Sequence, residues 1–338
     1  MVENSIEIID KKEDYPHLNK ETIEILFSDL TTKINWVLKE HFVAYEKAKK
    51  ILRDLTIIMQ QDQKPGNDLF SMLLVGDSGT GKTSIIKCFL NIHQRIIDRG
   101  DYSAFPVIHC ILSDASHGPK AVYYQILKQF NYPINPNKIK TIGLTTLENA
   151  CIGCLRDTEV RVLILDEFQH ALGRSEYDSQ AILNSLKKVL LEAGVPLVPV
   201  GTEDALKIIA RDNQIAKRCR LRSYSYLKPW KYDDNFKRFL TGYEKFLPFR
   251  EPSNLALNEM SKMIFNIAYK QGNYHIASRI AQNSTKNFNN HQDNSEFVKR
   301  IDLRNITEVI KITSRIALTE NSSKITLNHL KKYKKEYL

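Results

Sequence analysis

Short apolar runs alternate with amphipathic stretches through the middle of the chain. Four continuous apolar runs are typical of strands that are buried on both faces of a parallel sheet. They span residues 69–75, 107–112, 161–165 and 196–200. The stretches between them repeat apolar positions with helical spacing, most clearly at residues 83–92, 120–130 and 180–192. Repeated strand–helix units of this kind predict a three-layer α/β domain with a parallel sheet at its centre.

The chain on either side of these units carries helical patterns without strands. Apolar residues between positions 44 and 55 share one helix face. Beyond residue 235, we expect helices at residues 255–270, 274–287, 298–318 and 326–337. At 338 residues the chain exceeds a usual single domain. We therefore expect an N-terminal helical extension over residues 1–60, the α/β core over 61–235 and a small all-helical domain over 236–338.

Composition narrows the class of protein. A hydrophobic fraction of 42% and a charged fraction of 26% are typical of soluble globular proteins. No apolar run approaches the length of a membrane-spanning helix, and the polar, acidic start is unlike a secretory signal. Five cysteines, an odd number, argue against a disulfide framework and predict a reducing cytoplasm. The net charge of +10 is compatible with DNA or RNA as a partner, and equally with a mildly basic surface.

The clearest chemical signal is the segment Gly76–Thr83, which reads Gly-Asp-Ser-Gly-Thr-Gly-Lys-Thr and matches the phosphate-binding P-loop. An expected strand precedes it and an expected helix follows, an order that disfavours a chance glycine turn. Lys82 would neutralise the β- and γ-phosphates, and Thr83 would offer its hydroxyl to Mg²⁺. The nucleotide-binding residues that we expect here are Gly76, Asp77, Ser78, Gly79, Thr80, Gly81, Lys82, Thr83 and Ser84.

An acidic pair follows the apolar run at residues 162–165, which is the Walker B pattern. Asp166 would hold Mg²⁺, directly or through water, and Glu167 would polarise the attacking water as general base. Parallel strands end at the same sheet edge, so both acids would face the P-loop. The alternative is a strand that ends in a solvated acidic turn, which the P-loop upstream disfavours.

Two further candidates follow the last expected strand. Thr202 would either reach the γ-phosphate or the attacking water, or cap the helix that starts at Glu203, and both roles stay open. Residues 211–222 carry four arginines. Arg218 and Arg220 are candidates for a finger that contacts the γ-phosphate of a neighbouring subunit. The alternative for these arginines is a solvated helix face.

These motifs in this order resemble the AAA+ superfamily, and more closely the TniB/TnsC family of ATP-dependent regulators of DNA transposition. The specific stretches are Asp-Glu-Phe-Gln-His at residues 166–170 and Leu-Pro-Phe-Arg-Glu-Pro-Ser at 247–253. Residues 195–202, which end in Gly-Thr, and residues 211–218 also match the family's pattern. The resemblance covers roughly residues 35–338. It implies an AAA+ core followed by a helical lid domain.

The resemblance also implies an activity and partners. Such proteins bind and hydrolyse ATP with Mg²⁺, giving ADP and phosphate, and assemble as rings or filaments around duplex DNA. They pass a target site to a transposase, in some cases downstream of a CRISPR effector or another target-selection protein. Arg279 would be the sensor 2 arginine of the lid. The expected DNA contacts are Lys120, Lys138, Lys140, Thr141 and Thr145.

Other interpretations stay open. A helix that simply begins near Pro119 would explain the segment around Lys120 without DNA. The whole protein could be a different AAA+ protein, such as a helicase loader or a DNA-remodelling ATPase, or a nucleotide-gated scaffold whose hydrolysis is incidental. Cys151 and Cys154 form a C-x-x-C pair without a second pair or a suitably spaced histidine. We expect them to pack in a core rather than to bind zinc.

Overall fold

The computed structural model describes residues 14–64, 67, 69–112, 118–171, 176–219, 225–283 and 300–338. The chain divides into two compact units. The first, here called the core unit, is Glu46–Lys228. The second, here called the helical unit, is Met1–Tyr45 together with Pro229–Leu338. No described helix combines the length and hydropathy that crossing a membrane requires.

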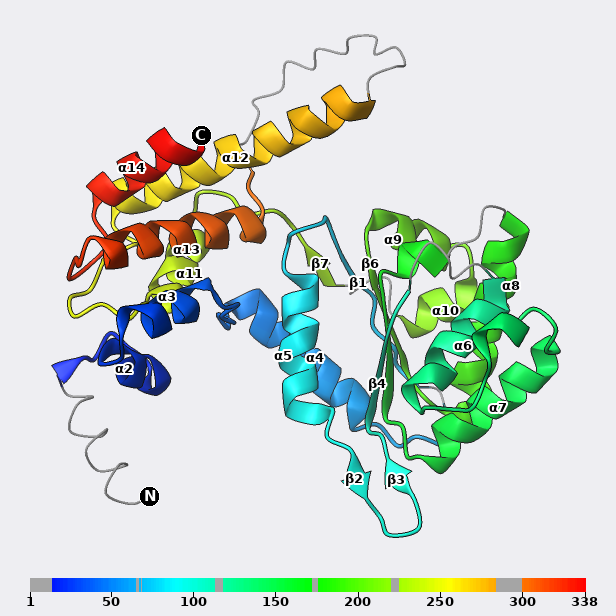
Figure 1. Cartoon of the computed structure of the whole chain (residues 1–338). Helices are drawn as coiled ribbons and strands as arrows, with labels where there is room; N and C mark the ends of the chain where they lie inside the picture. Colours follow the sequence, from blue (N-terminus) through cyan, green and yellow to red (C-terminus); the bar gives the residue numbers. More distant parts are fainter. Residues whose placement is uncertain are drawn as a thin grey trace. The chain divides into compact units, whose positions relative to one another are not determined.

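A parallel five-stranded sheet in the order β4-β5-β6-β1-β7 is the centre of the core unit (Figure 1). The strands are β1 (Leu74–Gly76), β4 (Val107–Ile111), β5 (Val162–Asp166), β6 (Leu197–Gly201) and β7 (Ser225–Leu227). Every residue of β1, β5 and β6 is buried, as expected of strands covered on both faces. The pairing of Leu163 with Leu197 and of Leu74 with Val200 fixes the register of these three strands.

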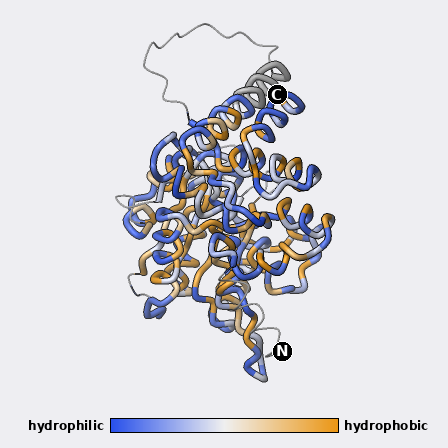
Figure 2. The backbone as a smooth tube through the Cα atoms, turned by 90° about the vertical axis from the view of Figure 1, so that its left-hand side faces the viewer, coloured by the Kyte–Doolittle hydropathy of each residue, from blue (hydrophilic) through white to orange (hydrophobic). Residues whose placement is uncertain are grey.

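Helices cover both faces of this sheet, so the expected three-layer α/β fold is confirmed. Figure 1 shows α4 (Glu46–Met59) and α5 (Lys82–His93) on one side, and α6 (Gly118–Gln129), α7 (Leu144–Asp157) and α8 (Glu176–Lys188) on the other. The remaining elements are β2 (Ile97–Asp98), β3 (Ser103–Ala104), α9 (Glu203–Ile209), α10 (Asn213–Arg218), the 3₁₀ turns η1 (Pro136–Lys138) and η2 (Phe168–Ala171), and the π-helical turn η3 (Val189–Ala193). In Figure 2 successive turns of the helices alternate between hydrophobic and hydrophilic residues, the pattern of helices that bury one face.

The helical unit is built from both ends of the chain. Its helices are α2 (Lys20–Leu26), α3 (Leu30–Leu38), α11 (Asp234–Glu244), α12 (Asn258–Asn283), α13 (Leu303–Thr319) and α14 (Leu327–Tyr337). The indole Nε1 of Trp36 in α3 donates a hydrogen bond to the backbone oxygen of Phe246 at 2.8 Å. Val37 is fully buried in the same hydrophobic core as Phe239 and Ile306. The segment before Glu46 thus belongs with the C-terminal helices, whereas the expected division separated them.

Helix α12 is longer than the sequence pattern indicates. We expected two helices, at residues 255–270 and 274–287, separated near Gly272. The structure has one helix over Asn258–Asn283. A Cβ atom at Gly272 would lie 2.8 Å from the side-chain nitrogen of Asn305 in α13. The glycine therefore allows close packing between two helices and does not end one.

Candidate nucleotide-binding and catalytic site

The P-loop runs from the end of β1 to the start of α5. Gly79 and Gly81 have φ angles of 80° and 98°, a left-handed conformation that glycine adopts without strain. Gly76 is closely packed, because a Cβ atom there would lie 2.7 Å from the backbone oxygen of Leu227 on β7. These glycines allow the chain to turn tightly and to present its N–H groups at the N-terminus of a helix, where an anion is favoured.

Lys82 places a buried ammonium group in this loop. The residue is only 8% exposed. Its Nζ donates hydrogen bonds to the backbone oxygens of Gly76 at 2.6 Å and Asp77 at 2.8 Å. The hydroxyl of Thr80 also donates to the Asp77 oxygen, at 2.7 Å. The loop therefore holds a positive charge beside the backbone that would wrap a phosphate, and it fits the phosphate groups of a nucleotide.

Asp166 and Glu167 lie at the carboxyl end of β5. Asp166 is 2% exposed, and its Oδ1 accepts a hydrogen bond from the backbone N–H of Glu167 at 2.8 Å. Its Oδ2 lies 3.7 Å from Nε2 of His109 on the neighbouring strand β4. Glu167 adopts a left-handed φ of 53°, which is unusual for a non-glycine residue and marks a sharp turn directly after the strand. A buried carboxylate at a strand end is a suitable ligand for Mg²⁺.

The sheet order brings the expected catalytic segments to one edge. Strand β6 lies between β5 and β1, so the parallel strands that end at Asp166, Gly201 and Gly76 are consecutive. Thr202 follows β6 and occupies the N-cap position of α9, but its side chain makes no capping hydrogen bond to that helix. Of its two possible roles, the capping role therefore has no hydrogen bond behind it.

Gln169 belongs to this site, although the sequence gave it no role beyond the family motif. Its Nε2 donates to Oε2 of Glu167 at 2.5 Å, and its Oε1 accepts from the backbone N–H of Thr202 at 3.2 Å. His170 lies on the other side, with Nε2 3.8 Å from Oε2 of Glu167. One signal could have identified Gln169: an amide two residues after the acidic pair can return to it across a tight turn.

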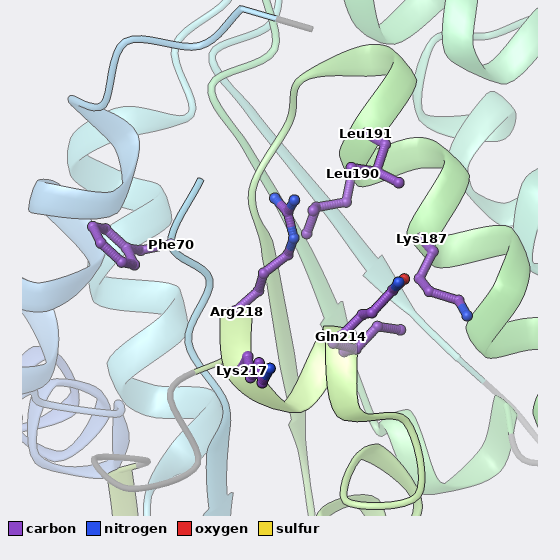
Figure 3. A pocket seen from close by; sticks show the side chains of 8 residues that line it. Phe70, Lys187, Leu190, Leu191, Gln214, Lys217 and Arg218 are labelled. Carbon is purple, nitrogen blue, oxygen red and sulfur yellow. The ribbon is translucent and has the colours of Figure 1, made fainter. Parts of the chain in front are cut away.

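Arg218 lies at a separate pocket of the core unit. It is the last residue of α10, and its Nη1 donates to the backbone oxygen of Asn67 at 3.4 Å. The pocket has a volume of about 270 Å³ and is lined by Phe70, Lys187, Leu190, Leu191, Gln214, Ile215, Lys217 and Arg218. Figure 3 shows the guanidinium group of Arg218 extending from α10 toward Leu190. Arg220, the other expected finger, lies outside the described residues.

The expected DNA contacts come from two loops that meet on the core unit. The Nζ of Lys120, in the first turn of α6, donates to the backbone oxygen of Lys140 at 3.1 Å. Lys138 ends η1, and its backbone oxygen accepts a hydrogen bond from the hydroxyl of Thr141 at 2.8 Å. Lys138, Lys140, Thr141 and Thr145 are all exposed. The structure thus brings together residues that are up to 25 positions apart.

Two other sequence candidates have different outcomes. Arg279 lies in α12, but the described structure does not include its side chain, so its sensor role stays a prediction. Cys151 is fully buried in α7 among the core residues, and this burial raises the pKa of its thiol well above the ordinary value. A thiol with a raised pKa stays protonated and behaves as a small apolar side chain.

Comparison with solved structures shows the same fold in proteins of low sequence identity. Cdc6p from Pyrobaculum aerophilum superimposes with a TM-score of 0.54 at 16% identity, covering 89% of this chain and 70% of that one. ORC2 of Aeropyrum pernix, determined as ADPNP–ADP complexes, gives 0.55 at 13% identity, covering 89% and 71%. ORC1 of Aeropyrum pernix in complex with DNA gives 0.50 at 12% identity, covering 90% and 69%.

The chain therefore spans about two thirds of the length of these structures. No protein of curated function matches its sequence. The fold is that of the AAA+ ATPases, as the order of the motifs predicts. The model of the bacterial TniB protein family matches residues 33–232, which is more than half of the chain and includes the P-loop, the acidic pair and Arg218. This chain is a member of the bacterial TniB protein family.

Proposed function

We propose that this protein is an ATP-hydrolysing, DNA-binding regulator of DNA transposition that assembles on duplex DNA and passes a target site to a transposase. The observation that carries the proposal is the meeting of three strand ends at one sheet edge. There the buried ammonium of Lys82, the carboxylate of Asp166 and the carboxylate of Glu167 come from neighbouring parts of one sheet. Membership of the TniB family supports the transposition role.

The nucleotide chemistry follows from the residues at this edge. Lys82 would exchange the backbone oxygens of Gly76 and Asp77 for phosphate oxygens when ATP binds. Thr83 and Asp166 would hold Mg²⁺, which when bound neutralises developing phosphate charge. Glu167 would accept a proton from the attacking water. Thr202, at the end of the strand between them, would contact the γ-phosphate or that water.

Assembly and DNA binding are the second part of the proposal. Arg218 would contact the nucleotide of a neighbouring subunit, so that ATP links successive copies of the chain. Arg220 and, in the lid, Arg279 are the other candidates for nucleotide contacts. The loops that carry Lys120 and Lys140 would contact the DNA backbone, which a chain of net charge +10 favours. Phosphate contacts of this kind position a protein without reading sequence. A target-selection protein would then decide where assembly starts.

The Glu167→Gln variant tests the catalytic part. The amide nearly preserves the shape of the side chain but cannot accept the proton, so ATP turnover should fall by roughly 10²- to 10⁴-fold. Affinity for ATP with Mg²⁺ should stay within about twofold of the wild type, because Lys82 and Asp166 are intact. The measurements are phosphate release and a titration with labelled ATP. Turnover by the variant at the wild-type rate would show that Glu167 is not the base.

A further inference from the structure

The side chain of Gln169 joins two parts of the site that come from different strands. Its nitrogen donates to the Glu167 carboxylate, which follows β5, and its oxygen accepts from the Thr202 backbone, which follows β6. Gln169 lies in η2, directly after Phe168, whose ring is fully buried and anchors the turn. Both ends of the amide are therefore used, in opposite directions, by residues expected to contact water and phosphate.

Gly201 shows that room for this amide is part of the fold. Gly201 is the last, buried residue of β6. A Cβ atom there would lie 2.6 Å from Oε1 of Gln169, closer than side-chain atoms normally approach. It would also lie 2.9 Å from the Cβ of Ala205 in α9. A glycine at this position is thus required for the amide of Gln169 to reach the start of α9.

We propose that Gln169 is a positioning residue for ATP hydrolysis, which holds the Glu167 carboxylate at a fixed distance from the Thr202 loop. The inference rests on the proposed function, since it concerns the residue assigned there as general base. The Glu167 side chain is 43% exposed and extends from a left-handed backbone turn. Without a hydrogen bond at its tip, such a side chain can occupy several rotamers, and few of them would meet a water beside the γ-phosphate.

The hydrogen bonds also connect the base to the strand on which the phosphate sensor is expected. A shift of Thr202 would move Oε1 of Gln169, and the same rigid amide would move the Glu167 carboxylate. Only an amide can make both bonds, because it donates from one end and accepts at the other. A glutamate at position 169 could still accept from Thr202 but would place a second carboxylate beside Glu167. A methionine could make neither bond at a similar side-chain length.

The test compares Gln169→Met and Gln169→Glu with the wild type in single-turnover ATP hydrolysis on the full chain with duplex DNA. Both variants should lower the hydrolysis rate about 10- to 100-fold, the range expected from losing one hydrogen bond to a charged group. ATP affinity and the unfolding temperature should stay close to wild type, since the P-loop is untouched. The matched control is Gln94→Met, which changes an exposed glutamine at the C-terminal end of α5.

A double-mutant cycle distinguishes positioning from a general structural role. If Gln169 acts through Glu167, adding Gln169→Met to Glu167→Gln should cause no further loss of rate. An equal loss in both backgrounds, or wild-type rates in both single variants, would overturn the inference while leaving the ATPase proposal intact. An absence of hydrolysis by the wild-type protein would overturn both. Gln169→Glu keeps the Thr202 bond, so it decides the matter if Gln169→Met does not fold.

Discussion

Lys82 offers a direct test of the phosphate site, because its ammonium has no other evident task. In the Lys82→Met variant a thioether of similar length replaces the charged group. The structure shows what is lost within the protein: hydrogen bonds from Nζ to the backbone oxygens of Gly76 and Asp77. Removing a buried charge also removes its desolvation cost, so we expect the free energy of unfolding to change little.

The effect on nucleotide binding should be much larger. With ATP bound, the ammonium would make about two charge-assisted hydrogen bonds to phosphate oxygens, each contributing at least about 1.5 kcal/mol. Their loss amounts to about 3 kcal/mol, which raises the Kd roughly 100-fold. An ATP concentration of about 100 times the wild-type Kd stabilises the wild-type protein by about 2.7 kcal/mol. The same concentration should stabilise the variant by only about 0.4 kcal/mol.

The assay is a titration with labelled ATP, supported by thermal unfolding with and without ATP and Mg²⁺. Lys87→Met is the matched control, because Lys87 lies on the same helix α5 and is exposed. The control should bind ATP like the wild type and keep the full thermal shift. Unchanged affinity in Lys82→Met would refute the assignment of Gly76–Ser84 as the phosphate site.

Two further predictions concern the interface between subunits and the helical unit. Arg218→Ala should lower ATPase activity only in the assembled state, and mixing it with Lys82→Ala protein should restore activity at hybrid interfaces; full activity of the single variant would indicate a solvated arginine. Burial lowers the pKa of His41, which stacks on Phe246 at 4.8 Å, below its ordinary value. The unfolded state then binds more protons, so the free energy of unfolding should fall as pH drops below about 6.5. Chemical denaturation across pH should show a weaker dependence in His41→Phe, and equal slopes would contradict this.

The parts of the site that sequence could predict depend on local chemistry. Gly76–Thr83 and the pair after β5 are contiguous motifs, and each needs only a strand before it to be placed correctly. The fold class followed from the same strands, because fully apolar runs between helical stretches can be covered only in a three-layer arrangement.

The features that sequence missed depend on contacts between distant residues. The bond from Gln169 to Thr202 exists because β5 and β6 are neighbours, an order that no local pattern specifies. Gly272 resembles a helix end in sequence, yet its role is to admit Asn305 from another helix. Likewise the bond from Trp36 to Phe246 joins residues 210 positions apart and places the N-terminal helices with the C-terminal ones.

Nucleotide-gated binding to duplex DNA is the central claim, and fluorescence anisotropy on two unrelated duplexes tests it most directly. The protein would be titrated at several salt concentrations, with and without a non-hydrolysable ATP analogue, alongside Lys120→Ala. Lys128→Ala is the control, because Lys128 is exposed at the other end of α6.

We predict tight binding only with the analogue, equal on both duplexes and weakened by salt. Lys120→Ala should weaken binding to both duplexes alike and reduce the salt dependence, while Lys128→Ala should not. Tight binding without nucleotide, or a Lys120→Ala defect confined to one duplex, would contradict the account.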